Sequence, residues 1–302
     1  MYESFPVRAT SLGEYTTEQL PSPVAATLEV PAPGFTGGLQ DDSAVIMDLP
    51  SRYAFYDFKD LYAVPFKGVH MRKLFAARQT QSQLHVVEAV STVLSNTAGD
   101  TKLAFKLTMP DFYFIMHWLR MESFTKSAFI HNSVCRNPEH IKEVQSGRVA
   151  QDTLTHSQVI NKSTLKTKML ERVPNPEAYP LSIRNLTLGE LRVQNLALGP
   201  ATMADTLEVS EHPDVMDSEF QYAASKAVYL KADRDSNTGR ELTFSDKLKI
   251  VDELSPDDHL IISAYEKVAT DYGVDETVQV TCKHCGHSRI DKIFIGAASF
   301  FQ

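Results

Sequence analysis

Near the C-terminal end of the chain, apolar residues alternate with polar ones at the spacing of a β-strand. Val278 and Val280 show this alternation, and Cys282 and Cys285 follow in a Cys-x-x-Cys arrangement that runs directly into Gly286. Glycine permits the tight backbone path that such a turn needs. Because the segment beyond it is again rich in isoleucine, we predict a strand, a turn carrying both thiols, and a returning strand over residues 278–295.

A second apolar segment, residues 128–135, has the pattern of a strand that ends in the only other cysteine, Cys135. Two thiolates do not complete a tetrahedral zinc site, which needs four ligands. We therefore predict that residues 129–135 and 278–295 meet in one small sheet, and that the residues between these two segments form a long connection.

The predicted metal is zinc, bound by Cys135, Cys282, Cys285 and one histidine. We favour His131 as the fourth ligand, but the pattern leaves the histidine open. Ordinary free thiols, a metal-free relative of a zinc fold and a redox pair are the alternatives; a redox Cys-x-x-Cys opens a helix, whereas a strand is expected here. The other histidines close in sequence to a cysteine are His140, His284 and His287.

Helical spacing dominates the middle of the chain. Residues 69–94 predict one or two helices, and a helix over residues 112–123 is apolar almost all round, including Trp118, which places it in the core. Thr108 is its expected N-cap, with Asp111 completing a capping box. Further helices are predicted over 186–199 and 215–232, after Thr243, and from Ser255 to a stop at Gly273.

Shorter aromatic segments at residues 49–56 and 61–66 are punctuated by proline, which indicates short or edge strands. The predicted fold class is α+β: a mostly helical body with short strands and a C-terminal zinc-ribbon-like hairpin. We place this single domain at residues 46–302, with a loop-rich insertion at about 136–180. Residues 1–45 combine many prolines with recurring large apolar groups, which predicts an extended arm that lies along its own domain or a neighbour.

Composition narrows the class of protein. The chain has 302 residues and a formal net charge of −8, so we expect no nonspecific grip on nucleic acid, which needs a basic face. Three cysteines do not form a disulfide scaffold, which predicts synthesis in a reducing cytoplasm. No apolar run reaches the length of about 18 residues that a membrane span needs. Phosphate-binding, dinucleotide-binding, metalloprotease and hydrolase motifs are missing, so we expect no enzyme.

The order of several segments resembles the baseplate hub protein family of T4-like, contractile-tailed bacteriophages. The match runs from about residue 49 to residue 295. It rests on residues 49–56, 61–66, 107–120, 223–230 and 246–255 and on the terminal Cys282-Lys-His-Cys285-Gly.

The resemblance implies a non-enzymatic structural subunit of the virion tail baseplate, present in several copies beside other baseplate and tail proteins. A subunit of this kind would be made in the host cytoplasm. The family pattern has a second cysteine beside Cys135 that is missing here, which leaves metal occupancy open. Two alternatives remain: an assembly factor that leaves before the particle is complete, and a zinc-ribbon accessory protein of nucleic acid or transcription.

Overall fold

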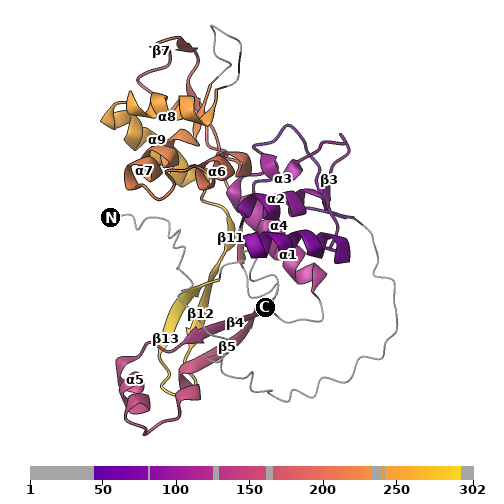
Figure 1. The fold of residues 1–302 in the computed structure, drawn as a ribbon, viewed down its shortest axis with the longest axis vertical. Helices are drawn as coiled ribbons and strands as arrows, with labels where there is room; N and C mark the ends of the chain where they lie inside the picture. Colours follow the sequence, from indigo (N-terminus) through magenta and orange to yellow (C-terminus); the bar gives the residue numbers. More distant parts are fainter. Residues whose placement is uncertain are drawn as a thin grey trace. The chain divides into compact units, whose positions relative to one another are not determined.

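A computed structural model describes residues 44–80, 82–124, 129–160, 166–232, 240 and 242–293. The chain divides into two units, Met1–Asp41 and Asp42–Gln302, and all described residues belong to the second. The predicted arm over residues 1–45 therefore lies almost entirely outside the described residues, and so does the apolar end at 297–302. The second unit is α+β, with helices and small antiparallel sheets, as the sequence predicts (Figure 1).

The first helical group, which consists of the helices between residues 68 and 123, alternates along the chain with the strands of a small three-stranded sheet in the order β1-β2-β3. Two separate helices occupy the predicted helical stretch between residues 69 and 94, and the second begins after Ser82, whose side chain accepts a hydrogen bond from the backbone N–H of His85. Only the second predicted aromatic strand exists, as β2. The elements are β1 (Val45–Ile46), β2 (Tyr62–Ala63), α1 (Gly68–Thr80), α2 (Gln83–Ser91), β3 (Leu94–Ser95), α3 (Leu103–Lys106) and α4 (Met109–Ser123).

The strand predicted over residues 49–56 is wrong, because this stretch is a series of turns. Arg52 and Tyr53 have positive φ angles of 53° and 61°, which no strand residue adopts. The aromatic side chains serve packing instead: Tyr56 stacks on Phe58 with ring centroids 4.8 Å apart, and both are buried. The aromatic residues of this segment therefore indicate that it belongs to the core, but they do not indicate its backbone conformation.

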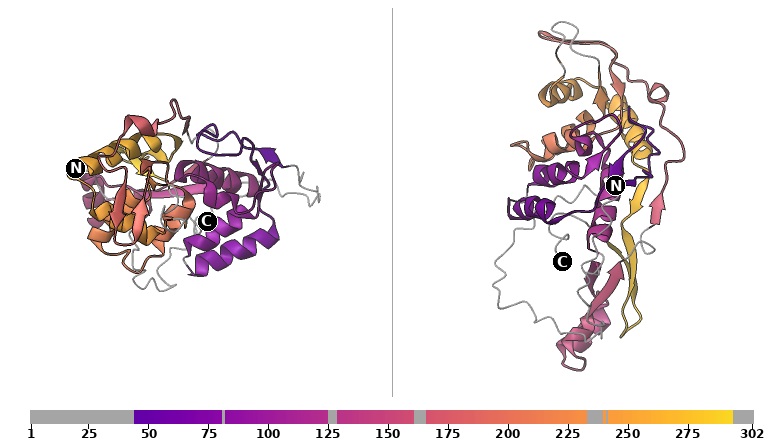
Figure 2. Two further views of the ribbon diagram at one scale, coloured as in Figure 1. Left: turned by 90° about the horizontal axis from the view of Figure 1, so that it is seen from above. Right: turned by 90° about the vertical axis from the view of Figure 1, so that its right-hand side faces the viewer.

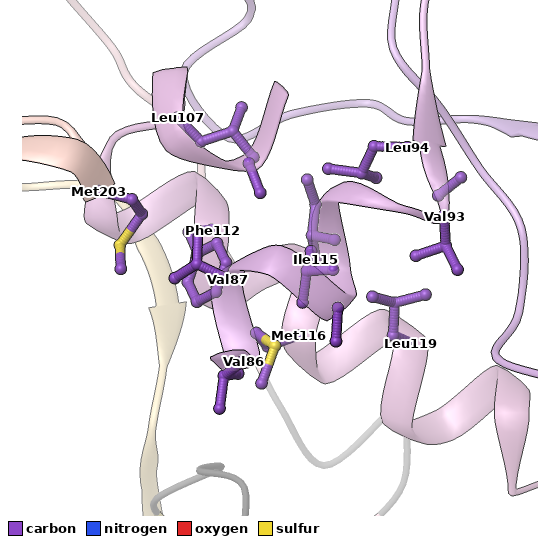
Figure 3. Close-up of a cluster of buried hydrophobic side chains, with 14 of the residues drawn as sticks. Val86, Val87, Val93, Leu94, Leu107, Phe112, Ile115, Met116, Leu119 and Met203 are labelled. Atoms are coloured by element: carbon purple, nitrogen blue, oxygen red, sulfur yellow. The ribbon is translucent and has the colours of Figure 1, made fainter. Parts of the chain in front are cut away.

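Helix α4 lies at the centre of the first hydrophobic core. Its side chains Phe112, Ile115 and Leu119 are buried in one cluster with Val86 and Val87 of α2, and Phe112 lies beside Val87 (Figure 3). The Met203 side chain joins this cluster from α6 (Met203–Ser210), and the Met203 backbone N–H donates to the carbonyl of Leu107 at 2.7 Å. Trp118 packs against the same core, as the sequence predicts, and its side chain is partly buried.

The start of α4 differs from its predicted capping box. Thr108 is the N-cap but makes no side-chain cap hydrogen bond. Its Oγ1 lies 2.6 Å from the hydroxyl of Tyr272, while Asp111 accepts hydrogen bonds from the backbone N–H of Ser51 (3.0 Å) and the hydroxyl of Tyr56 (2.5 Å). Burial raises the pKa of Asp111, against these hydrogen bonds, which lower it. The local capping pattern is thus replaced by a buried network between distant segments.

The second helical group, which consists of the helices between residues 218 and 269, has its own core, which includes Leu230, Ile250 and Tyr265. The predicted helix starts at Thr243 and Ser255 are confirmed, since both side chains form complete capping boxes with Asp246 and Asp258. The helix predicted over 215–232 is shorter and gives way to β10. These elements are α7 (Ser218–Ala227), β9 (Ala197–Leu198), β10 (Leu230–Lys231), α8 (Phe244–Asp252) and α9 (Pro256–Ala269).

No helix forms over residues 186–199, and that prediction is wrong. Strands β7 (Leu186–Leu188) and β8 (Leu191–Val193) pair there as an antiparallel hairpin. Gly189 lies in its turn with a φ of 59°, a conformation that favours glycine. Leu186, Leu188, Leu191 and Val193 recur at strand spacing, so the period of two outweighs the capping signal of Thr187. The predicted helix end at Gly273 is also wrong, because α9 ends at Ala269 and Gly273 is the first residue of a strand.

Residues 136–180, predicted as a loop-rich insertion, contain several regular elements. They supply one strand of a pair with β4 (Phe129–Val134) and one strand of a pair with β11 (Gly273–Asp275). The β4–β5 pair and the hairpin of β12 (Thr277–Thr281) and β13 (Ser288–Lys292) lie side by side (Figure 1, Figure 2). The elements within 136–180 are α5 (Pro138–Gln145), η1 (Gln151–Leu154), β5 (Thr155–Ile160), β6 (Lys166–Lys168) and η2 (Pro176–Ala178).

Candidate metal centre

The predicted strand, thiol turn and returning strand are present as β12, residues 282–287 and β13. Val278 and Val280 are buried on one face of β12, while their neighbours are exposed, which is the alternation that the sequence predicts. The turn is closed by two backbone hydrogen bonds of 2.9 Å, from Cys282 to the carbonyl of His287 and from Gly286 to that of Cys282. Gly286 has a φ of 70°, so glycine has a conformational role here.

The other side of the centre is built by the end of β4 and the first turn of α5. Cys135 follows β4 directly and is buried. Asn137 caps α5 by accepting a hydrogen bond from the backbone N–H of Glu139, and Pro138 occupies the first turn. This start places His140 one turn into the helix, where its side chain is buried.

Four possible ligand atoms converge at this place, from Cys135, His140, Cys282 and Cys285, and all lie within 4.8 Å of one another. The Sγ atoms of Cys135 and Cys285 are 3.6 Å apart. The Sγ atom of Cys282 is also 3.6 Å from Nδ1 of His140. The two segments, about 150 residues apart in sequence, meet as predicted. The prediction of one shared sheet is wrong, because β4 pairs with β5 and β12 pairs with β13 in separate two-stranded sheets.

These separations fit a tetrahedral metal site. With zinc–sulfur bonds of about 2.3 Å and zinc–nitrogen bonds of about 2.0–2.1 Å, neighbouring ligands lie about 3.5–3.8 Å apart. Three thiolates and one imidazole are a donor set typical of structural zinc. His140 also has an oriented second nitrogen, because its Nε2 lies 3.0 Å from Oγ1 of Thr153. Such a partner fixes the ring and leaves Nδ1 to face the sulfur atoms.

The backbone around the sulfur atoms favours thiolates. The N–H of Cys285 points at Sγ of Cys282 (3.4 Å), and the N–H of Asn137 points at Sγ of Cys135 (3.5 Å). A backbone hydrogen bond from His287 lowers the pKa of Cys285 to about 7. Burial raises the pKa of Cys135 to about 11. A bound cation would stabilise all three sulfur atoms as thiolates, since the thiolate is the form that coordinates metal.

The structure brings Cys135, Cys282 and Cys285 together but leaves His131 outside the group. The Nε2 atom of His131 lies 3.1 Å from Oδ2 of Asp291 on β13, a contact that joins β4 to the hairpin. His140, one of the histidines that the sequence left open, stands in its place. A usable signal was present: Asn137-Pro138 is a helix start that turns the third following residue back toward Cys135.

The two remaining candidate histidines surround the centre without joining it. His284 stacks on His140 with ring centroids 4.5 Å apart and an angle of 18° between the rings. Its Nε2 atom lies 4.0 Å from a carboxylate oxygen of Glu143. His287 contributes backbone groups to the turn. Among the residues that the structure describes, only the four named above form a group of His, Cys, Asp or Glu side chains that could hold a metal ion.

The described helices set one further limit: none of them combines the length and the apolar character that a bilayer crossing requires. Comparison with curated proteins and with solved structures finds no match. The model of one protein family, described as T4 bacteriophage base plate protein, matches residues 57–302, which include the first helical group, the second helical group and the whole candidate metal centre. The chain therefore belongs to the T4 bacteriophage base plate protein family, as the order of its sequence segments suggested.

Proposed function

We propose that this chain is a non-enzymatic structural subunit of the hub region of a contractile phage tail baseplate. The family match over residues 57–302 carries this proposal. In that role the protein acts through its surfaces, contacts other baseplate and tail proteins, and is present in several copies per particle.

The use of buried carboxylates supports a structural role. Asp205, Asp246 and Asp258 are buried, and each completes a capping box at the start of a helix. Asp258 also accepts hydrogen bonds from the backbone and hydroxyl of Ser182 (2.6 and 2.5 Å), which ties a loop to α9. Asp111 serves a backbone N–H and a tyrosine hydroxyl in the same way. Each of these acids has partners that stabilise the fold, whereas a catalytic acid would face a substrate.

The metal that we propose for Cys135, His140, Cys282 and Cys285 is zinc. Zinc would supply a redox-inert cross-link, since it has no accessible second oxidation state and prefers this donor set. The cross-link would hold the β4–β5 pair to the β12–β13 hairpin, which the contact between His131 and Asp291 also joins. A small two-stranded pair is only marginally stable alone, so a cross-link of this kind has a clear physical purpose.

We propose that the binding partners of this chain are proteins and not nucleic acid. Arg289, one of the basic residues of the hairpin, donates to Asp291 at 2.9 Å, so part of its charge is already neutralised within β13. The formal net charge of −8 adds repulsion toward phosphates. Salt-sensitive DNA binding by the purified chain at micromolar concentration would instead favour the zinc-ribbon accessory role.

Mass spectrometry of purified particles tests the structural role. Tail-containing particles should hold this chain in constant ratio to the other baseplate proteins, after washing in high salt that removes adsorbed host proteins. Particles from a host that supplies the chain with an affinity tag give a second readout, because the tag should be retained on intact tails. Absence from finished particles, together with loss of tail assembly when the chain is removed, would identify an assembly factor and overturn the structural role.

A further inference from the structure

A pocket of about 390 Å³ lies where α7, α8 and α9 meet, away from the metal centre. Its lining includes Glu219 and Tyr222 of α7, Val251 and Asp252 of α8, and His259 of α9. The two carboxylates are exposed, and the Tyr222 side chain is 55% exposed. The pocket therefore presents an aromatic ring and two negative charges to solvent.

The surroundings of the pocket are strongly acidic. Residues 211–219 and 252–258 hold eight carboxylates, of which Asp258 is buried, and no lysine or arginine. A cation close to the lining is Lys226, whose Nζ lies 5.8 Å from the Tyr222 ring centroid and also contacts Ser263 and Glu266. Two of these acids, Asp217 and Asp258, cap helices, and the others are not needed as caps in α7 or α9. A surface of this charge repels phosphates and anionic lipids, and it attracts a cationic partner.

Two exposed apolar side chains lie close in sequence to the lining residues. Met216, two residues before the lining residue Ser218, is 71% exposed, and Leu260, next to His259, is 69% exposed. Large apolar groups that remain this exposed beside a pocket are a feature of interaction sites. The occupant should therefore combine a positive charge with apolar neighbours.

The ring pair in the pocket favours a planar cation. Tyr222 and His259 stack with ring centroids 5.5 Å apart and an angle of 28°. The Nδ1 atom of His259 is buried and has no hydrogen-bond partner among the described residues. A guanidinium group stacks on aromatic rings and binds carboxylates with two parallel hydrogen bonds, which a lysine ammonium cannot do.

We propose that this pocket binds an arginine side chain of a partner protein, with apolar residues beside that arginine covering Met216 and Leu260. The site adds a defined protein-docking surface to the proposed structural role, and its charge sets the chemistry of the partner. Arginine and exposed aromatic residues are the side chains that most often dominate protein interfaces.

The test uses the purified full-length chain and the peptide Ac-Leu-Arg-Leu-Arg-Leu-NH₂, followed by NMR of tyrosine and histidine ring signals. A peptide with citrulline in place of arginine keeps the shape and loses the charge. We expect saturable shifts at Tyr222 and His259, and a Kd about tenfold higher for the citrulline peptide. Equal binding of both peptides, or shifts confined to other residues, would overturn the proposal.

Matched variants separate a local site from general charge. Glu219→Gln with Asp252→Asn should raise the Kd about tenfold, whereas Asp57→Asn with Glu88→Gln removes the same charge from exposed positions elsewhere and should leave Kd unchanged. Equal weakening in both pairs, or the same ring shifts on adding Ca²⁺ or Mg²⁺ alone, would also overturn it. The measurement does not depend on membership of the particle, so a negative result leaves the baseplate role intact.

Discussion

The Nδ1 atom of His140 lies 3.6 Å from Sγ of Cys282, although 142 residues separate the two in sequence. This contact joins the start of α5 to the turn between β12 and β13 at a distance that suits two ligands of one metal ion. We predict about one zinc ion per purified chain. Cys285→Ser and His140→Ala should lose zinc, as measured by elemental analysis, and should melt at a lower temperature.

His131→Ala is the matched control for His140→Ala, because both remove an imidazole from the same part of the chain. It should keep zinc, since the contact of His131 is with Asp291. Zinc retained by His140→Ala and lost by His131→Ala would restore the ligand that the sequence favoured. A melting temperature unaffected by a chelator would argue against a structural metal altogether.

Removing the metal should expose a reactive thiol at Cys285. A hydrogen bond from the backbone N–H of His287 lowers its pKa to about 7, while burial raises the pKa of Cys135 to about 11. The thiolate is the nucleophile, so alkylation of the metal-free chain by iodoacetamide should rise with pH around 7 and modify Cys285 first. Peptide mapping identifies the modified residue. Equal labelling of the metal-loaded chain would show that no ion protects the sulfur.

Asp205 should make stability depend on pH in the acidic range. Burial raises its pKa, but the ion pairs with Lys231 (2.8 Å) and Lys247 (2.9 Å) outweigh burial and bring it down to about 2 from an ordinary 3.8. A carboxylate whose folded pKa is depressed stabilises the fold above its unfolded pKa. That contribution, roughly 2 kcal/mol, should therefore fade as pH falls from about 4 to about 2.

Burial also lowers the pKa of Lys231 despite the same ion pair, so desolvation offsets part of the gain. Asp205→Asn should accordingly cost about 1–3 kcal/mol at neutral pH, because it also leaves two lysines without their carboxylate. Urea unfolding at pH 7 and pH 3 measures this difference. A variant whose free energy of unfolding still falls as steeply as that of the natural chain would place the acid sensitivity in other carboxylates.

The sequence predicts correctly those helix starts that depend only on residues close to one another in the chain. Thr243 and Ser255 stand three residues before an acid, and both complete the predicted capping boxes. Thr108 has the same signal, yet its hydroxyl is engaged by Tyr272, a partner 164 residues away that no local pattern reveals. The candidate metal ligands divide in the same way: the Cys-x-x-Cys turn is readable from sequence, but the place of His140, and not His131, beside the thiols depends on how α5 packs.

The N-terminal arm provides a prediction at the level of assembly. Residues 1–41 lie outside the compact unit that begins at Asp42, so a chain starting there should fold with an unchanged melting temperature. The recurring apolar groups of the arm gain about 1.5–3 kcal/mol each only if a surface buries them. We expect the shortened chain to be depleted from particles by mass spectrometry. Incorporation equal to the full-length chain, supplied from the same promoter, would exclude an assembly role for the arm.

The hydroxyl groups of Thr108 and Tyr272 lie 2.6 Å apart in a buried site where Tyr56 also lies 3.0 Å from Thr108 Oγ1. Thr108→Val keeps the shape and removes the hydroxyl, which leaves a buried tyrosine hydroxyl with one partner fewer and should cost about 1–3 kcal/mol. Tyr272→Phe should cost a similar amount. If the two groups act as a pair, the double variant should lose less than the sum of the single losses, since both unsatisfied groups are then gone. Urea unfolding of all four chains gives the coupling. Strict additivity would mean that the two hydroxyl groups stabilise the fold independently and do not act as a pair.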